Sequence, residues 1–341
     1  MFKFVKEAYK IVAARKRQIS GLATHPALFK KLFEIRKHIY STVVPLSAKC
    51  AVTPEPVPFG ERLTLDYKPI SYGEKWGGLF ECSWFNFTAK IEDDVKFENL
   101  YLLLDIGAEG CVFDDNGAPV KGLSGTLSFM DFMSSVQGKH LYKLPDDRKS
   151  LDIWVEGGNN GLMGKDTGMA KLKKAEVVLR NEILYKLYYD YLTLHILMIT
   201  VDKNSQRYRD ILKGLKTANS MLENYSDEEA AKVQAVLTPL LEEKSDIDFE
   251  IYATGHSHLD LAWLWPIRET KRKAGRTFSN QLDLIDNHND YIYGASQPQQ
   301  FEWTKQNYPA LYERIKKAVK DGNFEAQGGM WVEADTNITG G

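Results

Sequence analysis

The sequence is poor in the features that mark secreted and membrane-spanning proteins. It has three cysteines in 341 residues, Cys50, Cys82 and Cys111, and they fit neither a disulfide framework nor the spacing of a metal site. No apolar run reaches membrane-spanning length, and the charged amino terminus is not a secretory signal. These absences predict a protein of the reducing cytoplasm with no membrane partner.

The chain also lacks an excess of either charge. Its 44 basic and 46 acidic residues leave a formal net charge of −2, which excludes a broad field for binding nucleic acid or a membrane surface. With 43% hydrophobic and 26% charged residues, the composition is that of an ordinary globular protein, long enough for two to three domains.

Two regions have helical periodicity. We predict an N-terminal helical segment over residues 1–45 and a helical connector over residues 168–247. In the first of them the apolar residues at helical spacing are Leu28, Leu32, Ile35 and Ile39.

Residues 46–167 predict a β-sandwich, because short alternating segments follow one another without a helical pattern between them. Asp115-Asn116-Gly117 is a hairpin signal within this region. Four aromatic residues of the region either pack in the core or stack on a sugar. They are Trp76, Trp84, Phe85 and Phe87.

Residues 248–341 follow a strand–loop–helix order. DFEIYAT, YIYGAS and NFEAQ predict three strands, with QPQQFEW as the loop after the second. Because parallel neighbours need a crossover, this order predicts a parallel sheet or barrel with its reactive groups at the carboxyl ends of the strands.

The first of these strands leads into IYATGHSHLDLAWLWP, the most informative stretch of the chain. Its His256, His258 and Asp260 share one face if the strand continues, and imidazole and carboxylate together suit zinc. The alternative is that they are polar loop residues or histidines satisfied by hydrogen bonds in a core.

The other strand ends also carry polar or aromatic residues. Gln299, Gln300 and Trp303 follow the second strand, and Glu333 and Asp335 follow the third. Asp335 could serve as metal ligand or nucleophile, or simply cap a turn.

Two further features of the first loop and the helix after it have open roles. Trp263 either lines the metal site or fills the core. A basic stretch follows, for which we predict a solvated helix face, and it comprises Arg268, Lys271, Arg272, Lys273 and Arg276.

Three ordered motifs, GHSHLDLAWLWPIRETKRKAGRTF, ASQPQQFEW and GGMWVEADTNITGG, resemble those of glycoside hydrolase family 38 α-mannosidases. The resemblance is closest to the cytosolic and vacuolar branch, which includes bacterial members. LYLLLDIGAEGCVFDDNGAPVKGLSG and LYKLYYDYLTL resemble the β-domain and helical connector of that branch, so the similarity runs from about residue 72 to the end.

The resemblance implies a zinc ion held by His258, Asp260 and Asp335, with Asp335 also the nucleophile. His256 matches a position beside the ligands that does not bind the metal, and Trp263 matches an aromatic residue lining the mannose subsite. The implied activity is retaining hydrolysis of terminal α-mannosides in a mannose-containing oligosaccharide or glycan, through a covalent glycosyl-Asp335 intermediate.

The sequence departs from the family pattern at its end, six residues after Asp335. The family's fourth zinc ligand, its general acid/base and the remaining barrel strands have no counterpart here. We therefore expect an amino-terminal fragment that alone binds zinc weakly and hydrolyses nothing, taken from an enzyme that in full length can form a homo-oligomer.

Three other functions fit parts of the pattern. A metallo-β-lactamase-like hydrolase needs a last histidine where this chain has Leu261. An amidohydrolase-type enzyme would use His256 and His258 as its metal pair, with Asp260 incidental. A non-catalytic sugar-binding module would instead present the aromatic residues of the β-domain.

Overall fold

The computed structural model describes residues 24–333 except 94, 96–97, 125–139, 145–147, 162–163, 167, 245–249 and 329. In this part of the chain no helix has the length and apolar character needed to cross a membrane. The chain divides into two compact units. The first comprises Met1–Thr42, Glu98–Leu100 and Val178–Glu250, and the second comprises Val43–Phe97, Tyr101–Val177 and Ile251–Gly341.

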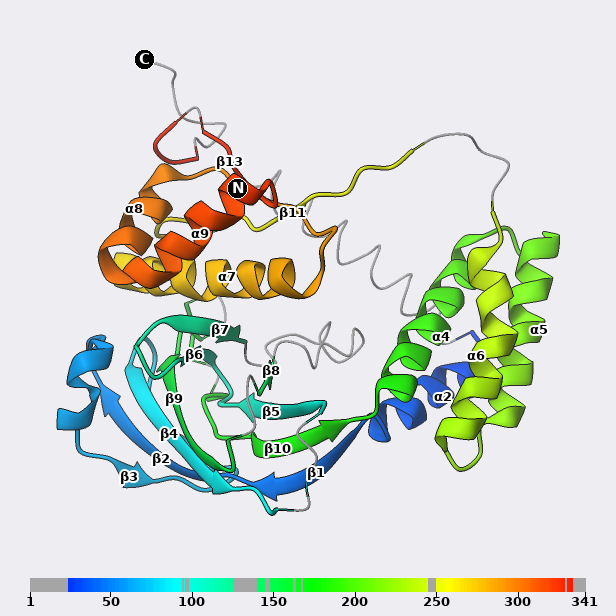
Figure 1. Cartoon of the computed structure of the whole chain (residues 1–341), viewed down its shortest axis with the longest axis horizontal. Coiled ribbons are helices and arrows are strands. Elements are labelled where there is room, and N and C mark those ends of the chain that lie inside the picture. Colours follow the sequence, from blue (N-terminus) through cyan, green and yellow to red (C-terminus); the bar gives the residue numbers. More distant parts are fainter. Residues whose placement is uncertain are drawn as a thin grey trace. The chain divides into compact units, whose positions relative to one another are not determined.

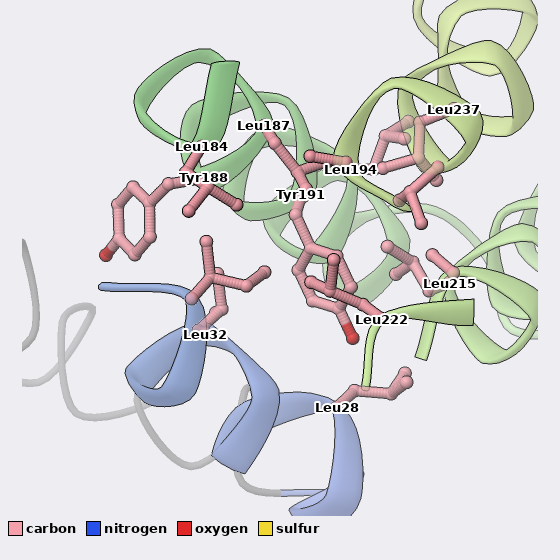
Figure 2. Packing of buried hydrophobic residues seen from close by; sticks show 14 of the residues in the cluster. Leu28, Leu32, Leu184, Leu187, Tyr188, Tyr191, Leu194, Leu215, Leu222 and Leu237 are labelled. Atoms are coloured by element: carbon pink, nitrogen blue, oxygen red, sulfur yellow. The ribbon is translucent and has the colours of Figure 1, made fainter. Parts of the chain in front are cut away.

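The first unit is built mainly from helices around one apolar core. The predicted N-terminal helical segment, residues 1–45, is confirmed as a helix over Pro26–Lys37, but a strand already begins at Tyr40, and residues 1–23 lie outside the described residues. Figure 2 shows Leu28 and Leu32 turned into the same cluster as Tyr188 and Tyr191. The helices are α2 (Pro26–Lys37), α4 (Glu182–Thr200), α5 (Gln206–Met221) and α6 (Asp227–Glu242).

Two antiparallel sheets make up much of the second unit (Figure 1), with strand orders β3-β2-β4-β9-β6-β7 and β1-β10-β5-β8. A short 3-10 helix, η1 (Phe59–Thr64), lies between β2 and β3. The strands are β1 (Tyr40–Pro45), β2 (Ser47–Thr53), β3 (Lys68–Pro69), β4 (Cys82–Lys90), β5 (Leu100–Asp105), β6 (Glu109–Phe113), β7 (Pro119–Leu123), β8 (Leu141–Lys143), β9 (Ser150–Gly158) and β10 (Lys174–Arg180). Strand β10 lies beyond residue 167, within the region predicted to be a helical connector, so that part of the prediction is wrong.

The four aromatic residues considered for sugar stacking are part of the core. Trp76, Trp84, Phe85 and Phe87 are at most 4% exposed. The Trp84 indole N–H donates to the Val57 carbonyl at 2.8 Å, so its polar atom is satisfied inside. Sugar stacking by these four rings is therefore wrong.

The predicted hairpin at Asp115-Asn116-Gly117 is confirmed between β6 and β7. Gly117 has a φ of 82°, a conformation that costs glycine little. The Asp114 carboxylate accepts the backbone N–H groups of Asn116 at 3.0 Å and Ala118 at 2.8 Å, which fixes the turn.

The C-terminal part of the second unit has three strands in the order β11-β12-β13, and both pairs are parallel as predicted. That these are the first strands of a (β/α) barrel stays a prediction. Segment QPQQFEW, predicted as a loop, belongs to helix α8, with Pro298 in its first turn. The elements are β11 (Gly255–His256), α7 (Ile267–Asn287), β12 (Tyr293–Ala295), α8 (Pro298–Asn307), α9 (Pro309–Asp321) and β13 (Phe324–Ala326).

Helix α7 packs one face on the α/β core and another on the six-stranded sheet. Ala274, Phe278 and Leu282 are buried against β12, β13 and α9. On the sheet side the approach is close at Gly122, where a Cβ atom would lie 2.7 Å from the Arg276 carbonyl oxygen.

The predicted solvated basic face of α7 is wrong for its central residues. Arg272 is 3% exposed, and its guanidinium donates to Glu156 of β9 at 2.7 Å and to Glu269 at 2.8 Å. Arg276 is 5% exposed and pairs with Glu269 and with Glu109 of β6. Buried charges persist only when they are paired, so this network ties α7 to the sheet.

Candidate active site

The carboxyl ends of the three parallel strands meet at one edge of their sheet. His256 ends β11, Ser296 follows β12, and the chain after β13 returns to place Glu333 beside both. The loop that follows β11 carries His258 and Asp260. The predicted convergence of strand ends is thus confirmed for the described residues.

His258 lies between two carboxylates. Its Nε2 atom is 3.0 Å from Asp260 Oδ1, and its Nδ1 atom is 2.5 Å from Glu333 Oε2. The other Glu333 oxygen, Oε1, accepts the hydroxyl hydrogen of Ser296 and lies 3.9 Å from His256 Nε2.

These contacts shift two pKa values in opposite directions. The hydrogen bond with Asp260 raises the pKa of His258 above its usual value, partial burial opposes that shift, and the charge of Glu333 adds to it. Burial would raise the pKa of Glu333, but hydrogen bonding from Ser296 and the neighbouring His258 outweigh burial and lower that pKa.

Buried amide side chains hold the backbone of the loop. Gln297 and Gln300 are each 4% exposed, and both donate to the Leu259 carbonyl oxygen, at 2.8 and 2.9 Å. The Thr270 hydroxyl, on α7, donates to the Leu261 carbonyl oxygen in the same loop. The segment between His258 and the helix is therefore fixed from two sides.

The predicted site residues differ in how the structure presents them. The side chains of His258 and Asp260 are 60% and 37% exposed, so both are open to solvent. Trp263 is 53% exposed, which excludes core filler. Asp335 lies outside the described residues, and its predicted roles stay predictions.

The donor set fits part of a zinc site. Among the described residues, no three or more histidine, cysteine, aspartate or glutamate side chains form a group that could hold a metal. His258 Nε2 and Asp260 Oδ1 nevertheless form a nitrogen–oxygen pair 3.0 Å apart, near the ~3.3 Å that separates two ligands of a tetrahedral zinc ion. They can act as two ligands once a third donor is added.

Two cavities among the described residues of the second unit lie elsewhere. One of about 570 Å³ is bordered by β2 and Trp76, and one of about 300 Å³ lies between Phe59, Trp84 and the start of α7. Neither is lined by His258 or Asp260, so the open loop edge is the better candidate because the metal-ligand chemistry is there.

From the sequence, Glu333 is recognisable only as a polar residue of a strand end, without a contact, and neither Ser296 nor Gln297 has a predicted role. Their positions directly after β12 were the available signal, because the carboxyl ends of neighbouring parallel strands share an edge.

Comparison with known proteins finds a match for two segments of the chain. Residues 248–341 match the N-terminal domain of glycosyl hydrolases family 38, and residues 44–187 match the jelly roll domain of alpha-mannosidases. These two segments are similar to domains of family 38 alpha-mannosidases. The jelly roll agrees with the predicted β-sandwich.

The curated proteins that resemble the chain include three alpha-mannosidases. Alpha-mannosidase 2C1 of Homo sapiens is 30% identical over 328 residues, which is 90% of this chain and 30% of the relative. Alpha-mannosidase G of Dictyostelium discoideum is 29% identical over 90% of this chain and 29% of its own length. The alpha-mannosidase of Saccharomyces cerevisiae is 26% identical over 81% of this chain and 27% of its own length. The chain thus spans about 30% of the length of the curated relatives it matches.

Proposed function

We propose that this chain contributes the first part of the active site of a zinc-dependent, retaining α-mannosidase. The observation that carries the proposal is the pairing of His258 Nε2 with Asp260 Oδ1, 3.0 Å apart at the carboxyl edge of parallel strands, within the region that matches the family 38 domain. We further propose that β11, β12 and β13 are the first strands of a (β/α) barrel.

The ligands in this proposal are His258, Asp260 and Asp335, and a bound zinc ion would supply positive charge to orient the hydroxyl groups of the sugar. Asp335 attacks the anomeric carbon and forms a glycosyl ester while the glycosidic oxygen leaves with a proton from a general acid. Water then cleaves the ester, so the anomeric configuration is retained. Exposed Trp263 packs on the apolar face of the mannose ring.

The substrate that follows is a terminal α-mannoside in a mannose-containing oligosaccharide. A cytoplasmic location is proposed too, and it is supported by three free cysteines, all of them buried. Homo-oligomer formation stays a prediction.

The test uses the natural gene product purified from its own cells. We expect hydrolysis of an aryl α-mannoside with retention of configuration, loss of turnover on chelation, recovery with zinc, and an inactive Asp335→Ala variant. Turnover that survives both chelation and Asp335→Ala would refute the proposal.

The amidohydrolase alternative is separated by zinc content. His258 contacts Asp260 directly, whereas His256 Nε2 is 3.9 Å from the nearest Glu333 oxygen, which favours Asp260 as the second ligand. We expect Asp260→Ala to lose bound zinc and His256→Ala to retain most of it. The reverse result would favour a His256–His258 metal pair.

A further inference from the structure

Glu333 has no role in the proposed reaction, yet its carboxylate is hydrogen-bonded to His258. Glu333 Oε2 contacts His258 Nδ1, whereas Asp260 Oδ1 contacts the other ring nitrogen, Nε2, at 3.0 Å. The His258 side chain is 60% exposed, so packing alone does not fix its ring. Hydrogen bonds must supply most of that constraint.

The Glu333 carboxylate is itself fixed from the neighbouring strand. Ser296, directly after β12, donates its hydroxyl hydrogen to Oε1. The backbone N–H of Glu333 points to Gln297 Oε1 at 3.5 Å, at the outer limit for a hydrogen bond. The Glu333 carboxylate is therefore held at the end of β12 by contacts that do not involve the imidazole.

Two carboxylates compete for the ring proton of a neutral His258, Asp260 at Nε2 and Glu333 at Nδ1. An ionised carboxylate only accepts, so the neutral ring that bonds to Glu333 carries its proton on Nδ1. In that tautomer the lone pair is on Nε2, where a metal would take the place of the hydrogen bond to Asp260. This is the arrangement in which metal-binding histidines commonly donate their second N–H to a carboxylate.

We propose that Glu333 is a positioning residue that holds the His258 ring and its Nδ1–H tautomer so that Nε2 can bind the metal. The inference rests on the proposed function, because it assumes that His258 is a zinc ligand. Direct ligation by Glu333 is disfavoured, since Oε1 already accepts from Ser296 and Oε2 from His258.

The experiment measures the zinc affinity of the 341-residue chain by competition with a chromophoric chelator, independently of activity. Loss of such a carboxylate partner typically weakens metal binding about 10–100-fold, and we expect Glu333→Ala to fall in that range. Glu333→Gln keeps an acceptor oxygen and should lose less. Glu325→Gln, on β13 with an exposed side chain, is the matched control and should bind zinc as the unchanged chain does.

A second readout separates positioning from a merely structural role. Nitrogen–proton correlation spectra of the metal-free chain at a pH where His258 is neutral should show a larger share of the Nδ1–H tautomer in the unchanged chain than in Glu333→Ala, in which only Asp260 is left to accept the ring proton. Ser296→Ala keeps the Glu333 carboxylate but removes the hydrogen bond that holds it, so it should produce a smaller shift toward the Nε2–H tautomer. Circular dichroism confirms that each variant is folded.

Three results would overturn the inference. If His258→Ala and Asp260→Ala weaken zinc binding but Glu333→Ala leaves affinity and tautomer unchanged, positioning by Glu333 is wrong and the zinc site stands. If Glu333→Ala removes one ligand from the zinc X-ray absorption spectrum, Glu333 binds the metal directly. If His258→Ala and Asp260→Ala leave zinc binding unchanged, the proposed function fails and this inference with it.

Discussion

Replacing Glu269 by glutamine should destabilise the second unit strongly. Glu269 is 4% exposed, and its carboxylate pairs with Arg272 at 2.8 Å and with Arg276, while Asn160 donates to it at 3.0 Å. Burial alone would raise its pKa, but the two guanidinium groups outweigh burial and lower the pKa from 4.5 to about 2.

The magnitude follows from two estimates that agree. A shift of that size corresponds to about 3 kcal/mol between the charged and neutral carboxyl, at about 1.4 kcal/mol per pKa unit. Removing one partner from a buried ion pair costs about 3–5 kcal/mol, because the other charge stays buried without compensation. We therefore expect Glu269→Gln to lower the free energy of unfolding by about 3 kcal/mol.

The assay is urea unfolding followed by tryptophan fluorescence. All seven tryptophans lie in the ranges of the second unit, so the signal does not report on the helical unit. The control is Glu313→Gln, which removes an exposed pair with Lys316 on α9 and should leave the midpoint unchanged. A loss below about 1 kcal/mol for Glu269→Gln would refute the account of the network.

The same carboxylate makes stability depend on pH. Because the folded pKa of Glu269 is depressed, its contribution is fully present above pH 4.5 and is lost as the pH falls toward about 2. Glu269→Gln should therefore show a shallower loss of stability than the unchanged chain across that acid range. Equal slopes would assign the acid sensitivity to other groups.

Three smaller effects follow from other contacts. Gly122→Ala would place Cβ 2.7 Å from the Arg276 carbonyl oxygen and should lower the free energy of unfolding by about 1–3 kcal/mol in the same assay. Gly60→Ala, where no atom lies within 4 Å of the added Cβ, should leave it unchanged, and equal effects of the two substitutions would contradict the close approach of α7. Asn181→Ala removes the side chain that caps α4 by accepting the Leu184 N–H at 2.9 Å, and it should lower the free energy of unfolding by about 1 kcal/mol when unfolding is followed by circular dichroism. An unchanged unfolding midpoint would contradict the cap. A thiol reagent should label no cysteine in the native chain at neutral pH, because all three cysteines are buried and burial raises the pKa of Cys50 and Cys111 to about 12. Rapid labelling of the native chain would contradict that burial.

Local patterns in the sequence predicted the elements that local physics controls. The turn at Gly117 requires a left-handed backbone, so the Asp-Asn-Gly signal sufficed. The leucine spacing in α2 and the strand–helix alternation after residue 250 fixed element types in the same way. The first strand of that alternation lies after the predicted segment DFEIYAT, residues 248–254. Its described part, residues 250–254, is not strand, Ile251 and Tyr252 are 79% and 87% exposed, and β11 begins at Gly255.

Features that depend on contacts between distant parts of the chain could not be predicted from these local patterns. Helix α8 was missed because its buried residues, Gln300 and Thr304, are polar and leave no apolar stripe. Arg272 and Arg276 looked solvated because their partners, Glu109 and Glu156, lie more than a hundred residues earlier. Periodicity within one helix carries no information about such partners.

The candidate site shows the same division. Strand-end topology placed His258 and Asp260 at one edge, where the structure has them in contact. The contacts of Glu333 and Ser296 required knowing which way the chain turns after β13, and that depends on packing between strands.

The most direct test of the central claim is a crystal structure of the 341-residue chain grown with zinc, with data collected at the zinc absorption edge. We expect one strong anomalous peak within bonding distance of His258 Nε2 and of the carboxylates of Asp260 and Asp335, with Nδ1 of His258 still bonded to Glu333. A peak shared by His256 and His258 with Asp260 turned away, or zinc bound only at other residues, would contradict it.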